Sequence, residues 1–256
     1  MSRISVVCLD MAGTTVRDEG TVMSAFTAAI AEATLPVRDF NAAMKYVRET
    51  MGQSKIEVFR HILHSEEAAR KANATFESSY AAAVRAGEIA AMPGAEELFA
   101  GCRAAGIKAC LSTGFSPATR DSIIAALGWD SLADLVLSPV DAGRGRPWPD
   151  MPLTALLRLG GGAVSELAVV GDTVSDVESG LRAGAGLVVG VLSGESTREE
   201  LESVPARTGL PGTPLVLDSV ADLLPHLELA LRTLVRPLFA DLALDPGQHR
   251  GHAAHP

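Results

Sequence analysis

The chain has 256 residues, of which 47% are hydrophobic and 21% charged, a composition that supports one sizeable core plus a small accessory domain and excludes disorder as the dominant state. Its 31 acidic residues outnumber 22 basic ones, and the formal charge of -9 argues against nucleic acid as a partner. Three cysteines in apolar surroundings, Cys8, Cys102 and Cys110, indicate reduced thiols and a cytoplasmic location.

The first apolar run, Ile4–Leu9, is short and rich in β-branched residues, and it ends at Asp10 and the turn-like sequence Ala12–Thr14. This pattern predicts a buried strand that leads into a loop. The run is too short for a signal peptide, and no apolar stretch in the chain reaches the roughly 18 to 20 residues of a membrane span. We therefore expect no membrane partner.

The stretch from about 17 to 92 is rich in Ala, Glu and Met and shows helical periodicity without a convincing strand, so we expect a helical insert. After it, short apolar runs alternate with helical patterns, which predicts a parallel sheet covered by helices. The further strands are expected at Ile107–Leu111, Asp134–Leu137, Leu167–Val170, Gly186–Val191 and Leu215–Leu217, and the helices at Ala95–Ala105, Pro117–Leu127, Met151–Leu159 and Ser175–Ala183.

The C-terminal region, 227–256, is expected to form a helix over Leu227–Leu244 followed by a polar tail. The tail contains His249, His252 and His255, which could bind a metal, but a frayed terminus is the favoured interpretation. The helices of the insert and this terminal helix are candidates for a homodimer contact, although no residue pattern specifies one.

Ligands of open α/β sheets bind outside the carboxyl ends of the strands, so four strand ends carry the functional hypothesis. Taken singly, each of these segments also fits an ordinary turn or helix cap. Together they supply carboxylates, a hydroxyl, a guanidinium and glycines, which suits a metal-bound phosphoryl group. The segments are Asp10–Thr14, Ser112–Gly114, Gly143–Pro147 and Gly171–Asp176.

These four segments, in this order, resemble the motifs of the haloacid dehalogenase superfamily of hydrolases, with a helical cap inserted after the first. The resemblance implies an α/β fold with a Rossmann-like core at 1–16 and 93–226 and a cap at 17–92. It implies that Asp10 is the nucleophile, that Thr113, Gly114 and Arg146 bind the phosphoryl group, that Asp10, Asp172 and the Ala12 carbonyl hold Mg²⁺, and that Thr173 and Asp176 support the metal site.

Two features of the sequence indicate which branch of this superfamily the chain resembles. Most phosphatases of this superfamily carry a second Asp two residues after the nucleophile as an acid for the leaving group, and this chain has Ala12. The cap segment Met51–Ile56 resembles that of the phosphonatase family, in which a cap lysine, Lys55 here, forms an imine with the substrate aldehyde and Met51 faces it. An imine delocalises the electrons left by a broken carbon–phosphorus bond, so that no acid is needed at the leaving carbon.

The chain also departs from the phosphonatase pattern. Val58 stands where a His is typical, Phe115 where a Tyr is typical, and the usual Cys near Gly20 is missing. His61 and His64 follow on the predicted helix and are expected to be exposed to solvent. The alternative interpretation of Lys55 is a solvated surface charge, yet it is one of only four lysines beside 18 arginines.

Three functional hypotheses follow. The first is a Mg²⁺-dependent hydrolase that cleaves a small phosphonate, phosphonoacetaldehyde or a close analogue, into an aldehyde and inorganic phosphate. The second is a Mg²⁺-dependent phosphatase or phosphotransferase acting on a small phosphate ester. The third, a binding or regulatory module on a degenerate scaffold, is disfavoured because the nucleophile, metal ligands and phosphate-binding residues are all present.

Overall fold

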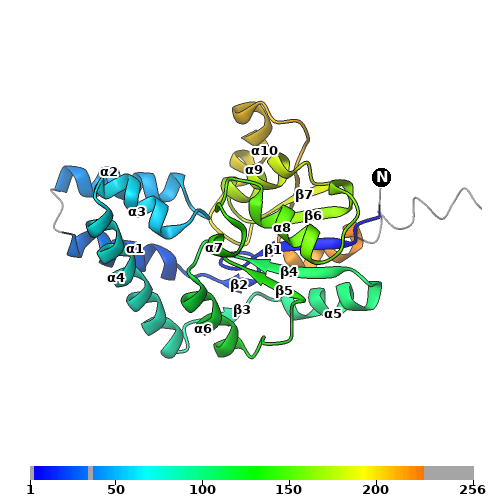
Figure 1. The fold of residues 1–256 in the computed structure, drawn as a ribbon, viewed down its shortest axis with the longest axis horizontal. Helices are drawn as coiled ribbons and strands as arrows, with labels where there is room; N and C mark the ends of the chain where they lie inside the picture. The colour runs from blue at the N-terminus through cyan, green and yellow to red at the C-terminus, as the bar shows by residue number, and fades with distance from the viewer. Residues whose placement is uncertain (1–2, 34–36, 228–256) are drawn as a thin grey trace, which may run out of the picture.

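The computed structural model describes residues 3–33 and 37–227, and a parallel sheet of six strands forms its centre (Figure 1). The strand order is β5-β4-β1-β6-β7-β8, which places the first strand in the middle of the sheet. All six predicted strands are confirmed, with small shifts at their ends. They are β1 (Val6–Asp10), β4 (Lys108–Ser112), β5 (Leu135–Leu137), β6 (Leu167–Gly171), β7 (Leu187–Val191) and β8 (Leu215–Leu217).

Strand β1 is buried along its whole length, because its alternate side chains enter two different cores. Val7 and Leu9 belong to the apolar cluster that includes Phe99, whereas Val6 and Cys8 pack in a second cluster with Met151. A strand buried on both faces is typical of parallel sheets covered by helices. The position of β1 puts its last residue, Asp10, at the centre of the carboxyl edge of the sheet.

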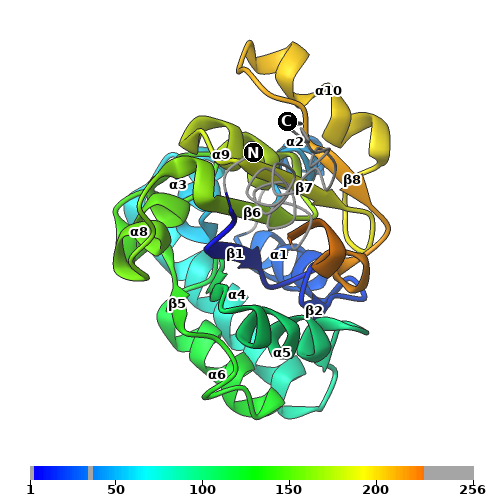
Figure 2. The same cartoon turned by 90° about the vertical axis from the view of Figure 1, so that its right-hand side faces the viewer.

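Helices cover both faces of the sheet, with α8 and α9 on one side and α5 on the other (Figure 2). The four predicted helices of this region are confirmed, and α7 and α10 are additional. The helices are α5 (Ala95–Ala105), α6 (Pro117–Leu127), α7 (Pro139–Ala142), α8 (Asp150–Arg158), α9 (Val174–Ala183) and α10 (Arg198–Thr208), with short 3₁₀ turns at Val164–Glu166 and Val220–Asp222.

The segment between β1 and α5 contains four helices, as its composition suggests. They are α1 (Thr21–Glu32), α2 (Val37–Glu49), α3 (Lys55–Leu63) and α4 (Glu66–Arg85). Helix α4 packs against α1 and α3, and aromatic rings fill the space between them. The ring centres of Phe26 and Phe76 lie 4.8 Å apart and those of Phe26 and Phe59 lie 5.2 Å apart. We call these four helices the cap.

A two-stranded antiparallel ribbon, absent from the prediction, connects the cap to the sheet. Its strands are β2 (Val16–Arg17) and β3 (Ala90–Ala91), and Val16 pairs with Ala91. Because each strand has only two residues, neither produces a recognisable alternating pattern in the sequence. The ribbon brings both ends of the cap to one place, beside the carboxyl end of β1.

The cap packs directly on the sheet domain, since one apolar cluster runs through both. This cluster includes Phe26 and Phe76 of the cap together with Leu111 and Phe115 of the sheet domain. The ring of Phe115 lies 4.6 Å from that of Tyr80 on α4. Because the two parts are closely packed, the cap is closed over the sheet domain, with little space for water between them.

The remaining predictions concern the histidines, the C-terminal region and membrane spans. His61 and His64 are exposed, as expected, and the ring of His61 stacks on that of Tyr46 at 4.0 Å. The predicted terminal helix beyond Leu227 and the tail with His249, His252 and His255 lie outside the described residues. None of the helices in the described ranges has the length and apolar character needed to cross a membrane.

Candidate active site

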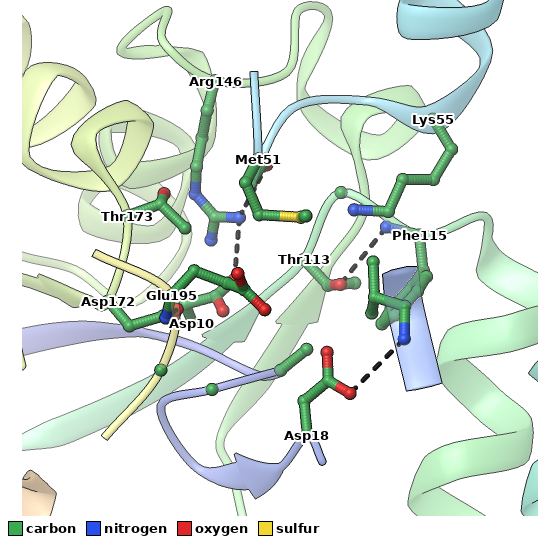
Figure 3. Close-up of a pocket in the computed structure, with 16 residues that line it drawn as sticks. Asp10, Asp18, Met51, Lys55, Thr113, Phe115, Arg146, Asp172, Thr173 and Glu195 are labelled. Carbon is green, nitrogen blue, oxygen red and sulfur yellow. Dashed lines mark hydrogen bonds and ion pairs between the residues drawn. The ribbon is translucent and has the colours of Figure 1, made fainter. Parts of the chain in front are cut away.

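The carboxyl edge of the sheet meets the cap in a pocket of about 420 Å³, part of it open to solvent (Figure 3). Nine of the ten residues singled out from the sequence line this pocket, and the tenth, Asp176, contacts one of them, Arg146. The nine are Asp10, Ala12, Met51, Lys55, Thr113, Gly114, Arg146, Asp172 and Thr173. Residues that are far apart in the sequence are therefore brought together as the motif order suggests.

The loop after β1 is shaped around Asp172. Gly13 has a φ of +85°, and a Cβ at this position would lie 2.5 Å from an oxygen of Asp172, so only glycine fits. The next residue, Thr14, donates a hydrogen bond from Oγ1 to Asp172 Oδ1 at 2.9 Å. Thr15 Oγ1 donates to the carbonyl of Asp10 at 2.8 Å. The segment Gly13–Thr15 thus contacts both the carboxylate of Asp172 and the backbone of Asp10.

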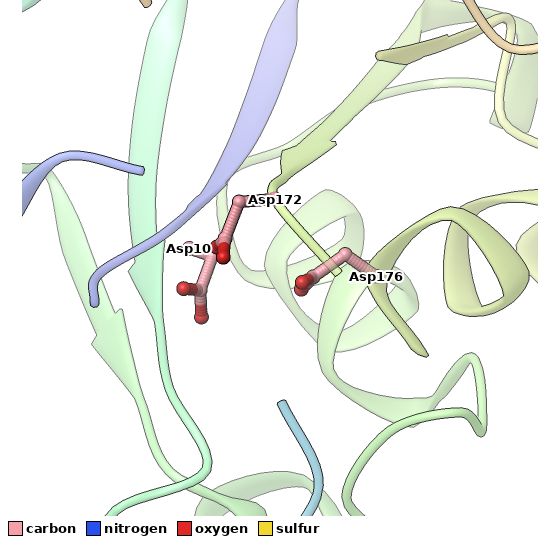
Figure 4. Close-up of side chains that lie close together, drawn as sticks. All are labelled: Asp10, Asp172 and Asp176. Atoms are coloured by element: carbon pink, nitrogen blue, oxygen red, sulfur yellow. The ribbon is translucent and has the colours of Figure 1, made fainter. Parts of the chain in front are cut away.

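Three buried carboxylates converge at this point (Figure 4). One oxygen from each of Asp10, Asp172 and Asp176 lies within 4.8 Å of the others. Burial raises the pKa of Asp10 to about 7, even though Arg146 opposes this shift. Burial, followed by the charge of Asp10, also raises the pKa of Asp172. One guanidinium does not balance three carboxylates, so this donor set fits a hard divalent cation such as Mg²⁺.

Asp176 differs from the other two carboxylates because the protein already engages both of its oxygens. Oδ1 lies 2.6 Å from Arg146 Nε, and Oδ2 accepts hydrogen bonds from the backbone nitrogen, at 3.1 Å, and the hydroxyl of Thr173. Thr173 in turn caps α9 by accepting from the Asp176 backbone nitrogen. This reciprocal capping box supports the expectation that Thr173 and Asp176 buttress the site.

Arg146 connects the carboxylates to the cap. Its side chain is buried, with Nη1 2.7 Å from Asp10 Oδ1, and Nη2 donates to the hydroxyl of Ser112 at 2.7 Å. Nη1 also donates to the carbonyl of Gly52 in the cap at 3.3 Å. A fixed guanidinium next to the candidate nucleophile is well placed to receive a phosphoryl oxygen. Thr113, also buried, follows β4 on the opposite wall of the pocket.

Lys55, the first residue of α3, is buried with only 7% of its surface exposed. Its Nζ lies 5.0 Å from the ring centre of Phe115 and 5.8 Å from that of Phe26. Among the described residues the amine makes no hydrogen bond or ion pair within 4 Å, whereas the Lys55 backbone nitrogen donates to the Gly114 carbonyl at 3.4 Å. Burial lowers the pKa of Lys55 to about 8, with Asp10 opposing the shift. The interpretation of Lys55 as a solvated surface charge is therefore wrong.

The loop before α3 makes the closest approach between cap and sheet domain. Gly52 has a φ of +85°, and a Cβ there would lie 2.4 Å from Thr173 Oγ1. Opposite it, a Cβ on Gly114 would lie 2.4 Å from the carbonyl oxygen of Gln53. These two glycines let the backbone of the cap rest on the strand ends and close the pocket between Lys55 and Asp10.

We expect Gly52→Ala to impair closure of the cap. Its methyl group would collide with Thr173, in addition to the roughly 1 to 2 kcal/mol cost of a left-handed alanine. Steady-state kinetics should show a higher KM and a lower kcat. The matched control is Gly87→Ala, which has a φ of +76° and no atom within 4 Å of its Cβ. Identical kinetics in the two variants would show that the contact at Gly52 has no role in closure.

Several residues of the pocket wall were not predicted from the sequence. Asp18 precedes α1, Val22 lies in its first turn, and Gly194 and Glu195 follow β7. The rule that strand ends carry function, applied to β7 as to the other strands, would have found Glu195. Burial, followed by the charge of Asp18, raises the pKa of Glu195. Its backbone nitrogen donates to Asp172 Oδ2 at 3.0 Å, so this loop also supports the carboxylates.

The chain is similar in sequence to known hydrolases. The chain is 34% identical over 116 residues to phosphonoacetaldehyde hydrolase of Bacillus cereus strain B4264, which covers 43% of this chain and 44% of that protein. The match thus spans less than half the length of that relative. Over 203 residues the chain is 29% identical to the probable phosphatase IndB of Dickeya dadantii, covering 77% of this chain and 85% of that one.

Among solved structures, a phosphonoacetaldehyde hydrolase-like protein from Oleispira antarctica matches with a TM-score of 0.72 and 26% identity. The alignment covers 93% of this chain and 95% of that one, so the cap and the sheet domain have counterparts in the same fold. The haloacid dehalogenase-like hydrolase family matches residues 4–184, which is most of the chain. Together with its α/β fold and convergent strand-end motifs, this match shows that the chain belongs to the haloacid dehalogenase-like hydrolase family.

Proposed function

We propose that this hydrolase cleaves the carbon–phosphorus bond of phosphonoacetaldehyde, or a close phosphonate, into an aldehyde and inorganic phosphate. The observation that carries the proposal is the buried amine of Lys55, which faces the same pocket as Asp10 and has no ion-pair partner within 4 Å among the described residues. A buried amine with a lowered pKa is the form that attacks a carbonyl. The names of two relatives agree with this substrate.

The reaction begins at Lys55. Its ammonium group releases one proton and the neutral amine adds to the aldehyde carbon. That proton returns as water leaves, so that a protonated imine forms one carbon away from the phosphonate carbon. The carboxylate of Asp10 then attacks phosphorus, and the electrons of the breaking carbon–phosphorus bond move into the imine to give an enamine. Protonation of the enamine carbon and hydrolysis release the aldehyde and Lys55, while water hydrolyses the aspartyl phosphate to inorganic phosphate.

The other residues of the pocket bind and orient the substrate. Arg146, Thr113 and the backbone at Gly114 are placed to contact phosphoryl oxygens on the side of Asp10. Mg²⁺, held by Asp10, Asp172 and the Ala12 carbonyl, would reduce the repulsion between the carboxylate nucleophile and the anionic phosphoryl group. Met51 and Phe115 give the pocket apolar surface, which excludes water from the imine.

The direct test measures phosphate and aldehyde released from phosphonoacetaldehyde by the full chain with Mg²⁺, beside a panel of sugar and alkyl phosphate monoesters. We expect equal amounts of phosphate and acetaldehyde from the phosphonate and slow hydrolysis of the monoesters. The reverse preference, with efficient ester hydrolysis and no acetaldehyde, would refute carbon–phosphorus cleavage.

The pH dependence of imine formation follows from the lowered pKa of Lys55, which is about 8. Only the neutral amine attacks, so its fraction falls about tenfold for each pH unit below 8 and is nearly complete above about pH 9. We expect the rate of imine formation, measured by borohydride trapping, to rise about tenfold from pH 6 to pH 7 and to level off above pH 9. A rate that does not change over this range would contradict the prediction.

Hydrolysis of a small phosphate ester is the second candidate function. The observation in its favour is the similarity to probable phosphatase IndB, which extends over 77% of this chain. The observation against it is Ala12, which lines the pocket where a phosphatase would carry its acid. An alkoxide leaving group without an acid departs slowly.

The substitution Ala12→Asp distinguishes the two functions. If the wild type lacks an acid for alkoxide leaving groups, the new carboxyl group should raise the kcat for alkyl phosphates by about tenfold or more. It should not raise carbon–phosphorus cleavage, because the enamine carbon takes its proton after bond cleavage. Activated aryl phosphates, whose leaving groups need no acid, serve as the internal control. A wild type that hydrolyses alkyl and aryl phosphates equally well would favour the phosphatase.

A further inference from the structure

Asp18 occupies the wall of the pocket between the ribbon strand β2 and helix α1. One carboxylate oxygen, Oδ1, caps the helix, accepting from the backbone nitrogens of Thr21 at 2.7 Å and Val22 at 3.3 Å. In Figure 3 the other oxygen is turned away from this bond. Asp18 is partly buried, and the adjacent ion pair between Arg17 and Glu19 does not include it.

Imine formation requires a group that moves protons. The ammonium form of Lys55 carries three hydrogens on nitrogen, the protonated imine keeps one, and the carbonyl oxygen leaves as water with the other two. The carbon–oxygen bond breaks as the carbon–nitrogen double bond forms, so the overall change neither consumes nor releases a proton or an electron. One acceptor near the nitrogen that can also reach the oxygen is sufficient.

The charged groups that act on Lys55 are Asp10, Arg146, Asp18 and Asp176. Arg146 remains protonated and cannot accept a proton. Asp10 contacts Arg146 at 2.7 Å and is needed for attack on phosphorus. Asp176 has both oxygens engaged, by Arg146 and by the cap of α9. Asp18 remains, because only one of its oxygens takes part in a hydrogen bond, the cap of α1, and it is not needed for attack on phosphorus.

The side chains nearest to the Lys55 amine are apolar. On α3, one turn after Lys55, Val58 is buried and apolar. The two rings nearest to Nζ belong to Phe26 and Phe115. Glu195 lines the pocket, but its backbone holds Asp172 on the side of the carboxylates. Lys55 and Asp18 line the same pocket and form no ion pair within 4 Å, and we place the aldehyde group between them.

We propose that the carboxylate of Asp18 is a further catalytic residue, which carries both protons from Lys55 Nζ to the aldehyde oxygen during imine formation. This inference rests on the proposed function. Asp18 accepts one proton from the ammonium group, which frees the amine to attack. It then passes protons from nitrogen to oxygen until water leaves, and it ends as the carboxylate, opposite the positive charge of the imine. Hydrolysis of the product imine runs through the same steps in reverse.

The test follows labelling of Lys55 in a single turnover of the Mg²⁺-loaded full chain with phosphonoacetaldehyde, stopped at successive times with borohydride. Asp18→Asn is the main variant, since its amide oxygen can still cap α1 but takes no proton. We expect labelling of the Lys55 peptide, measured by mass spectrometry, to be about 100-fold slower. The affinity for inorganic phosphate should stay within twofold of wild type.

Two further variants separate proton transfer from structure. Glu19→Gln makes the same change of charge at the adjacent exposed carboxylate, which does not line the pocket. In this variant Lys55 should be labelled at the wild-type rate. Asp18→Ala should label slowly, and added formate should restore part of the rate because it supplies the missing carboxylate. If Lys55 of Asp18→Ala is labelled slowly and formate does not raise the rate, the role of Asp18 is helix capping and the proton relay is overturned.

The remaining outcomes separate this inference from the function on which it rests. Labelling at the wild-type rate in Asp18→Asn would overturn the relay alone and leave the imine mechanism in place. A wild type that is never labelled at Lys55 would overturn both the relay and the proposed cleavage of phosphonates.

Discussion

Asp10→Asn is expected to lower turnover by at least about 10⁴-fold while the protein stays folded. The substitution replaces the attacking carboxylate by an amide of almost the same shape. It also removes one negative charge from a buried group of three carboxylates, where burial already raises the pKa of Asp10 to about 7. The thermal stability of the metal-free variant should therefore equal or exceed that of wild type.

Phosphate release and thermal unfolding measure the two parts of this prediction. The matched control is Asp218→Asn, because Asp218 is highly exposed and lies outside the pocket, and its substitution should leave both quantities unchanged. Mass spectrometry checks that the asparagine at position 10 has not deamidated back to aspartate. Turnover by Asp10→Asn close to the wild-type rate would exclude a covalent aspartyl phosphate.

The sheet and most of its helices can be predicted because their signals are local. Helix α6 begins at Pro117 after the N-cap Ser116, and it ends before the C-cap Gly128, which has a φ of +68°. The sequence therefore contains recognisable signals for both of its ends. Helix α10 was missed since only Leu201 and Val204 are buried and Pro205 lies within it. Its start nevertheless carries a signal, the capping box of Thr197 and Glu200.

The site is predictable to the extent that it depends on the sheet. Asp10 and Asp172 end neighbouring parallel strands or follow them directly, so their proximity follows from topology alone. The environment of Lys55 does not follow in this way. The rings of Phe26 and Phe115 come from the cap and the sheet domain, and they meet around the amine only when the two parts dock. Asp18 enters the wall for the same reason.

Burial of Lys55 lowers the free energy of unfolding at neutral pH. Its pKa falls from the ordinary value near 10.4 to about 8, so the unfolded chain holds more protons between these values. The penalty is fully present below about pH 8, where it amounts to roughly 3 kcal/mol, and it disappears as the pH rises above about 10.4. A lysine retained at this cost in an arginine-rich chain indicates that its amine serves a function.

Lys55→Met should therefore stabilise the protein and abolish carbon–phosphorus cleavage together. Methionine keeps an unbranched apolar chain among Met51, Val58 and the two rings but carries no amine. We expect the Tm at pH 7 to rise by about 5 to 10 °C, and the difference from wild type to shrink as the pH is raised toward 10. Cleavage of phosphonoacetaldehyde should fall by several orders of magnitude, since no imine can form.

Lys55→Arg completes the comparison because it retains a positive charge but cannot form an imine. It should lose cleavage as fully as Lys55→Met while still binding inorganic phosphate, but without the gain in Tm, because a buried cation remains. Loss of cleavage in both variants, with a gain in Tm for Lys55→Met alone, separates the chemistry of the amine from the electrostatics of its charge. Cleavage by Lys55→Arg close to the wild-type rate would show that the charge of Lys55, and not its nucleophilicity, is what the pocket uses.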